Sequence, residues 1–200
     1  MESPRKTRLK DQPSTRASEP ERQKIGSSAA STHVRLKLET RLDHQRVDHL
    51  ISGFDLTRAG DYGAFLTLNF MALTVLRPHW RRADEDDFNG LVDALAADLA
   101  ALGMEPSDEV DPVRGPIDGL GLAYVVRGSR LGSKILRKRV GPGLPTEYFG
   151  FRLGQPWARF LDELDLRGET GPQDEFALFA GVRETFAVYA RLADTPGGIA

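Results

Sequence analysis

The apolar residues of this chain recur with the period of an α-helix from His33 onward, and no alternation of the kind that builds a sheet persists. Helix start and stop signals divide this pattern into six predicted helices, over residues 33–53, 57–77, 84–102, 117–140, 155–165 and 172–192. A proline-rich loop is expected at 103–116, and an irregular segment with room for one more turn of helix at 144–155. The sequence therefore predicts an all-α, single-domain helical bundle of six or seven helices.

Single residues mark several of the predicted helix ends. Thr57 is expected to cap the second helix, and Pro78 to stop it. Asp84 opens the third helix. Pro156 and Pro172 each stand at the first position of a helix, where proline is favoured because its missing N–H is not needed there.

Composition narrows the class of protein. Hydrophobic residues make up 40% and charged residues 28% of the 200 residues, which is typical of a soluble globular protein. The absence of cysteine excludes disulfides and thiolate ligands to a metal or haem. No apolar run approaches the ~20 residues of a membrane span and no signal peptide is evident, so a cytoplasmic protein without a membrane partner is expected. The net charge of −2 gives no support to nucleic-acid binding.

Residues 1–32 differ from the rest of the chain. They have a net charge of +3, against −5 for the remainder, and only three large aliphatic side chains. A segment of this kind cannot bury a core, so we expect a disordered basic tail, a helical domain at 33–194 and a frayed end at 195–200. The tail is either a basic contact arm or a solvated leader without a specific role.

The predicted helix over Tyr124–Arg137 has two glycines, Gly128 and Gly132, one turn apart in its interior. Each costs a helix roughly 1 kcal/mol relative to alanine, and together they clear one face for something that approaches the backbone. That object is either a second helix or a ligand. The segment is also strongly basic, and we expect most of its cations to be solvated: Arg127, Arg130, Lys134, Arg137, Lys138 and Arg139.

Four histidines are present, and no two are spaced as a helical two-histidine metal site requires. His44 shares its side of the first helix with Thr40, Val47 and Ile51, which places it at the edge of the buried face. Lys37 lies two turns earlier on almost the same line. His44 is either a half-buried residue that packs and hydrogen-bonds, or the ligand of a planar iron complex whose carboxylates meet a nearby cation.

Two segments resemble haem oxygenase, in particular the bacterial biliverdin-producing type associated with bacteriophytochromes. Thr40-Arg-Leu-Asp-His44 is similar to the family segment Thr-[Lys/Arg]-x-x-His, whose histidine is the proximal haem ligand. Tyr124-Val-Val-Arg-Gly-Ser-Arg-Leu-Gly-Ser133 is similar to the distal-helix pattern that ends in Gly-Ser-x-Leu-Gly-[Gly/Ala]. The resemblance covers roughly residues 34–192 and implies a haem-oxygenase-like fold.

The resemblance also implies roles for individual residues. It makes His44 the metal ligand and places Gly128, Ser129 and Gly132 at the catalytic distal side. The implied haem-binding residues are His44 itself with Lys37, Tyr124 and Arg159. Haem would be both substrate and cofactor, cleaved with O2 to biliverdin, Fe(II) and CO with electrons from an external ferredoxin or reductase. A bacteriophytochrome is the implied acceptor of biliverdin.

The chain departs from the family pattern at two positions. Ser133 replaces the usual second glycine, which is expected to hold the distal helix farther from the haem. Ser129 stands where mammalian-type members have an aspartate that orders distal water, so the route of proton delivery stays open. Two other functions are compatible with the same residues: a non-enzymatic haem carrier or sensor of this fold, and a helical protein-interaction module.

Overall fold

The computed structural model describes residues 30–105, 111–113 and 115–194, and this part of the chain is helical without any strand. The predicted all-α class is confirmed, with more and shorter elements than expected. They are α1 (Thr32–Glu39), α2 (Arg41–Ser52), α3 (Ala59–Leu76), the 3-10 helices η1 (Arg77–His79) and η2 (Arg82–Asp84), α4 (Glu85–Ala101), α5 (Gly119–Arg137), α6 (Glu147–Gly150), α7 (Trp157–Gly168) and α8 (Pro172–Ala193). The predicted tail and frayed end lie almost wholly outside the described residues, although Thr32 already belongs to α1.

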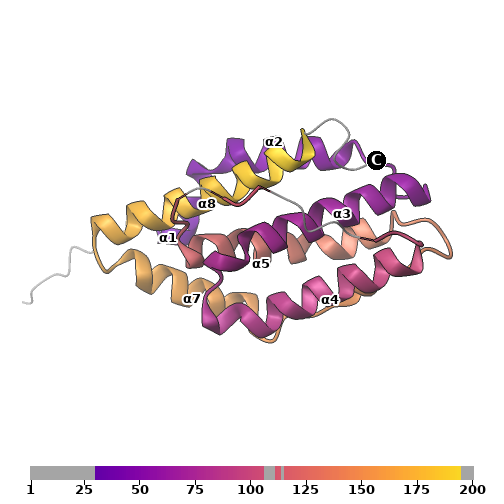
Figure 1. Ribbon diagram of the computed structural model, residues 1–200. Helices are drawn as coiled ribbons and strands as arrows, with labels where there is room; N and C mark the ends of the chain where they lie inside the picture. Colours follow the sequence, from indigo (N-terminus) through magenta and orange to yellow (C-terminus); the bar gives the residue numbers. More distant parts are fainter. Residues whose placement is uncertain (1–29, 106–110, 114, 195–200) are drawn as a thin grey trace, which may run out of the picture.

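The bundle is organised around α3 and α8, which supply much of the core. The helix α3 packs against α4 and α8, while α2 and α5 both pack against α8 (Figure 1). The helix α7 lies against α1 and α8, and the single turn α6 closes over α4 and α5. Largest among the fully buried side chains are the rings of Tyr62, Phe88 and Phe160.

The predicted continuous helix over 33–53 is wrong at Thr40, where α1 ends and α2 begins. Thr40 has φ −98° and ψ 11°, and its hydroxyl donates to the Leu36 carbonyl at 2.8 Å. This local hydrogen bond competes with regular helix geometry. Backbone hydrogen bonds nevertheless run from Thr40 to Leu36 and from His44 to Thr40, each 3.0 Å, so the two helices join without a loop.

The predictions for two helix starts, at Thr57 and Pro156, are also wrong. The amide and hydroxyl of Thr57 both donate to Asp55 Oδ1, at 3.0 and 2.7 Å, so Thr57 forms a turn before α3 instead of capping it. Pro156 has ψ 142° and therefore precedes α7 at the cap position. Pro172 does stand at the start of α8, after Gly171 with φ 146°.

The start of α5 is fixed by a side-chain cap and by a close helix contact. Asp118 accepts hydrogen bonds from the amides of Leu120 and Gly121, at 3.0 and 2.9 Å. A Cβ on Gly121 would lie 2.5 Å from the Leu178 carbonyl oxygen of α8, so only glycine lets the two backbones come this close. The helix α5 is thereby held on α8 at its first turn.

The stretch Ala59–His79, which is α3 with η1, is long and apolar enough to cross a membrane, with 21 residues and a mean hydropathy of 1.2. We expected no apolar stretch as long as a membrane span. This stretch has the required length and composition, so that expectation is wrong in these two respects. Of its most apolar window, 56% is buried inside the bundle, as in the core helix of a globular fold.

Candidate functional site

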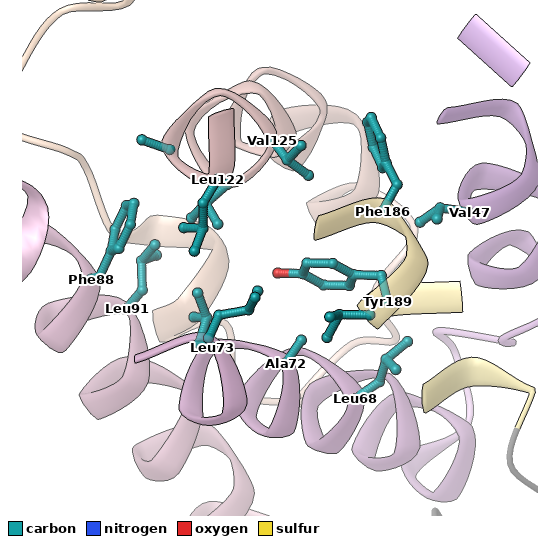
Figure 2. Packing of buried hydrophobic residues seen from close by; sticks show 14 of the residues in the cluster. Val47, Leu68, Ala72, Leu73, Phe88, Leu91, Leu122, Val125, Phe186 and Tyr189 are labelled. Atoms are coloured by element: carbon teal, nitrogen blue, oxygen red, sulfur yellow. The ribbon is translucent and has the colours of Figure 1, made fainter. Parts of the chain in front are cut away.

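The candidate site lies where α2 and α5 flank α8. Both helices pack extensively against α8, and in the described chain they make at most slight contact with each other. Phe186 of α8 lies between Val125 of α5 and Val47 of α2 (Figure 2). The His44 ring meets Phe186 edge-on, with 5.6 Å between the ring centroids and 82° between the planes. Phe186 is thus the common neighbour of the two flanking helices.

His44 is far more exposed than its position on the helix predicts. Its side chain is 61% exposed, although Thr40 and Val47, on the same side and one turn away, are buried. The predicted place at the edge of a buried face is therefore wrong for the side chain. The helical period gives the direction in which a residue points, whereas its exposure depends on what the neighbouring helices leave uncovered.

A carboxylate lies beside His44, as it does beside many metal-binding histidines. The His44 Nδ1 lies 2.9 Å from Asp48 Oδ2, one turn later in α2. A carboxylate at this distance favours the tautomer with the proton on Nδ1, which leaves the lone pair on Nε2. The described residues have no group of three or more His, Cys, Asp or Glu that could hold a metal ion.

The inner face of α5 is open at Ser129. Val125 and Ser133 lie one turn before and after it, about 40° away around the helix. Both are buried, whereas Ser129 is exposed. The Ser129 hydroxyl donates to the Val126 carbonyl at 2.8 Å. An exposed residue between two buried ones on the same face indicates an opening in the packing at this level of α5.

Gly128 and Gly132 are not used for helix packing. A Cβ on Gly132 would meet no described atom within 4 Å, and one on Gly128 would make only an ordinary contact with the Trp157 ring, at 3.6 Å. The sequence left two explanations for Gly128 and Gly132, a second helix or a ligand close to the backbone. Close approach of a second helix occurs at Gly121 and not at these two glycines. Gly132 therefore faces space that the described residues leave free, whereas Gly128 lies beside Trp157.

The remaining predicted site residues are spread over three helices. The Tyr124 ring lies tilted against the Trp157 ring, with 5.8 Å between the centroids and 37° between the planes, and burial raises the pKa of the Tyr124 hydroxyl. Lys37 is exposed on α1 and Arg159 is exposed on α7. No contact joins either cation to His44 within the described part of the chain. Tyr124 and Gly128 thus both lie beside Trp157. Lys37 and Arg159 are on α1 and α7, and thus on different helices from Tyr124, Gly128 and His44.

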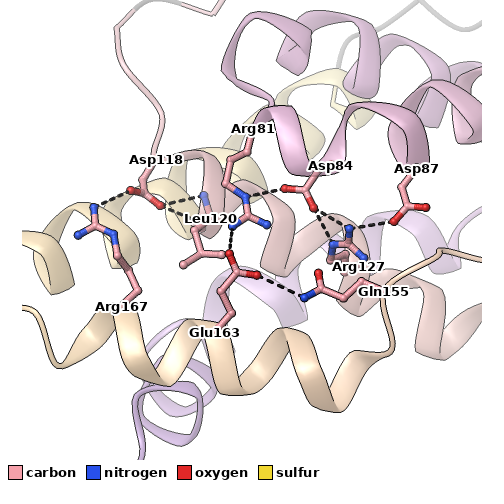
Figure 3. A network of polar contacts seen from close by, with 10 residues as sticks. Arg81, Asp84, Asp87, Asp118, Leu120, Arg127, Gln155, Glu163 and Arg167 are labelled. Carbon is pink, nitrogen blue, oxygen red and sulfur yellow. Dashed lines mark hydrogen bonds and ion pairs between the residues drawn. The ribbon is translucent and has the colours of Figure 1, made fainter.

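Arg127 was expected among the solvated cations of α5, and this is wrong. Its side chain is 2% exposed and it binds Asp84 and Asp87 (Figure 3). Arg130 is also partly buried and donates to the Tyr148 carbonyl at 2.6 Å. The sequence indicated the burial of Arg127 only through its place next to the apolar face of the helix. Its carboxylate partners could not be recognised from the sequence, because they are 40 or more residues away.

Comparison with known proteins finds a likeness of fold and no match in sequence. No protein-family model matches the chain, and no curated protein sequence matches it. Among solved structures, the haem oxygenase from Neisseria meningitidis, determined in its NO- and CO-bound forms, superposes with a TM-score of 0.68 at 23% sequence identity. The match covers 82% of this chain and 91% of that one. The chain therefore has the helical fold of that haem oxygenase.

Proposed function

We propose that this protein binds haem between α2 and α5, with His44 as the iron ligand, and cleaves it as a haem oxygenase of the biliverdin-producing type. The observation that supports this most is the exposed His44 imidazole, whose Nδ1 lies 2.9 Å from an Asp48 carboxylate oxygen and whose Nε2 would be left for a metal. The open glycine turn of α5 and the fold shared with a haem oxygenase that binds NO and CO support the same function.

The residues around His44 divide into two roles in this proposal. Phe186 packs against the His44 imidazole, and this contact would keep the imidazole ring in one orientation. Lys37 and Arg159 are exposed cations that would pair with the two propionates, and Tyr124 would offer a hydroxyl to the same edge. Together they would fix the rotation of the ring about the axis through the iron, and so the position at which it is opened.

The distal turn of α5 has a complementary role. Gly128 and Gly132 present backbone without a side chain, so neither can ligate iron or fill the space above the ring. The Ser129 hydroxyl donates a hydrogen bond to the Val126 carbonyl, which leaves its oxygen lone pairs to accept a hydrogen bond from ordered water. Bound haem would supply both the iron that activates O2 and the porphyrin that is opened to biliverdin, Fe(II) and CO.

The partners follow from this reaction. The chain has no cysteine and hence no thiolates for an iron–sulfur centre, so an external ferredoxin or reductase would deliver the electrons. We propose a cytoplasmic reaction, and a bacteriophytochrome as the acceptor of biliverdin.

Hemin titration of the purified protein tests the proposal. We expect 1:1 binding with a Soret band typical of histidine ligation, and loss of that band in His44→Ala. His49→Ala is the matched control, because His49 is exposed on the same helix. Addition of ascorbate or ferredoxin should then yield bilin absorbance. Failure to bind hemin would contradict the haem site, and stable hemin without bilin would indicate a carrier or sensor.

A further inference from the structure

Arg127 forms a buried ionic clamp with two carboxylates. Its Nε and Nη2 donate to Asp84 Oδ1 at 2.9 and 2.6 Å, and Nη2 also donates to Asp87 Oδ2 at 2.9 Å (Figure 3). Asp84 is completely buried and also accepts from Arg81 Nε at 2.6 Å. The guanidinium lies near the rings of Phe88 and Phe160, 6.0 and 5.4 Å from their centroids. The orientation of the Arg127 guanidinium is therefore fixed by two carboxylates and two aromatic rings.

The clamp joins α5 to three other parts of the bundle. Asp84 belongs to η2 and Asp87 to α4, and Arg81 continues the network to Glu163 of α7. Burial opposes the charge of Arg81, but its contacts with Asp84 and Glu163 outweigh this and raise the pKa of its guanidinium. Arg127 is the member of the network that belongs to α5, so the position of that helix depends on it.

Arg127 stands at the boundary between two different halves of α5. Before it, the helix is buried through most of Leu120–Val126. After it come Gly128, the exposed Ser129, and two large apolar side chains, Leu131 and Ile135, that are 58% and 69% exposed. The second half thus has fewer apolar contacts than the first, and Arg130 is another side chain that holds it, by donating to the Tyr148 carbonyl at 2.6 Å.

A clamp of this kind contributes orientation more than stability. The cost of desolvating buried charges offsets most of their attraction, so replacing a whole buried network by apolar residues of similar size is often neutral, whereas removing one partner leaves a buried charge with fewer contacts. A guanidinium held by two carboxylates has one direction, however, because its donors lie in a fixed plane. Residues one turn apart point about 40–60° away from each other around a helix, so a rotation of that size would replace Gly132 by a neighbouring side chain at the open face.

We propose that Arg127 is a positioning residue, whose clamp by Asp84 and Asp87 holds α5 at the rotation that presents Gly128 and Gly132 to the ligand. The identity of that ligand as haem rests on the proposed function. The clamp itself is a property of the protein without ligand, and it can be tested there.

The experiment compares Arg127→Met and Arg127→Lys with Arg81→Met, which removes a different partner of Asp84. Arg127→Met keeps the length of the side chain, and Arg127→Lys keeps the charge without the planar donor group. We expect all three to fold cooperatively. In the haem-free protein, amide hydrogen exchange over residues 128–133 should be about tenfold faster in Arg127→Met than in the wild type or Arg81→Met. Arg127→Lys should lie in between.

Hemin provides the second measurement. We expect affinity about tenfold weaker in Arg127→Met, and a mixture of bilin regioisomers where the wild type gives one main product. If haem-free Arg127→Met exchanged its amides over residues 128–133 as slowly as the wild type, the positioning role of Arg127 would be overturned. The same would follow if exchange were accelerated equally in Arg81→Met. Absence of hemin binding by the wild-type chain would contradict the proposed function while leaving the exchange result as the test of Arg127.

Discussion

Gly121 and Gly132 lie in the same helix, α5, and have opposite surroundings. A Cβ on Gly121 would lie 2.5 Å from the Leu178 carbonyl oxygen and 2.9 Å from the Val182 amide nitrogen. A Cβ on Gly132 would meet no described atom within 4 Å. The first glycine therefore allows two helices to touch, whereas the second removes a side chain where the described protein has nothing to fit.

This difference separates a structural glycine from a candidate functional one. Interior glycine weakens a helix, and at Gly121 the close approach of α5 and α8 offsets that cost. No such contact offsets it at Gly132, and the neighbouring Leu131 and Ile135 are exposed. A helix that is tightly packed in one half and open in the other is suited to hold a ligand against the open half.

The largest effect on this comparison is expected from Gly121→Ala. The added methyl would overlap backbone atoms of α8, which cannot rotate away, so α5 and α8 must separate. We predict a loss of about 3 kcal/mol in the free energy of unfolding, measured by urea denaturation. A variant as stable as the wild type would show that the α5–α8 contact is looser than described.

Gly132→Ala should have the opposite effect on stability. Alanine favours a helix by roughly 1 kcal/mol over glycine and meets no described atom here, so unfolding should require more urea. Hemin affinity should nevertheless fall about tenfold, because the methyl occupies the space proposed for the ring. Gly60→Ala is the matched control, since its Cβ would also meet nothing within 4 Å, in the first turn of α3. Unchanged hemin affinity in Gly132→Ala would contradict the ligand-facing role.

The smallest effect is expected from Ser133→Gly, which restores the glycine typical of the resembled family. Ser133 is 5% exposed, and its Oγ lies 3.5 Å from the Ser129 carbonyl, so the fold already accommodates the side chain. We predict a loss of about 0.5 kcal/mol from lower helix propensity, with hemin affinity nearly unchanged. A marked gain in hemin affinity would show that Ser133 does hold α5 away from the ligand.

The helical period predicted the class of fold and the approximate extent of most helices, because burial of one face repeats along each of them. It failed at Thr40 and Thr57, where a side chain forms a hydrogen bond with a group close by in the sequence. Bonds of this kind compete with the helix over only a few residues, and the apolar pattern does not register them.

The site was predictable to a similar degree. His44 and the glycine turn were recognisable as unusual residues within helices, although their roles in haem binding remain predictions. The exposure of His44 and the burial of Arg127 were both predicted wrongly. Each depends on other parts of the fold: the helices around His44 leave most of its ring uncovered beyond the contact with Phe186, and Asp84 supplies the buried partner of Arg127.

The sequence by itself determined that the chain is helical, that α5 has glycines in its interior, and that a histidine stands on the adjoining face of an earlier helix. Only the tertiary structure decided that Gly121 meets another backbone while Gly132 meets none, and that Arg127 is clamped between carboxylates. The reason is physical: periodicity and helix propensity act between near neighbours in the chain. Which surface lies opposite a residue is set by how whole helices pack.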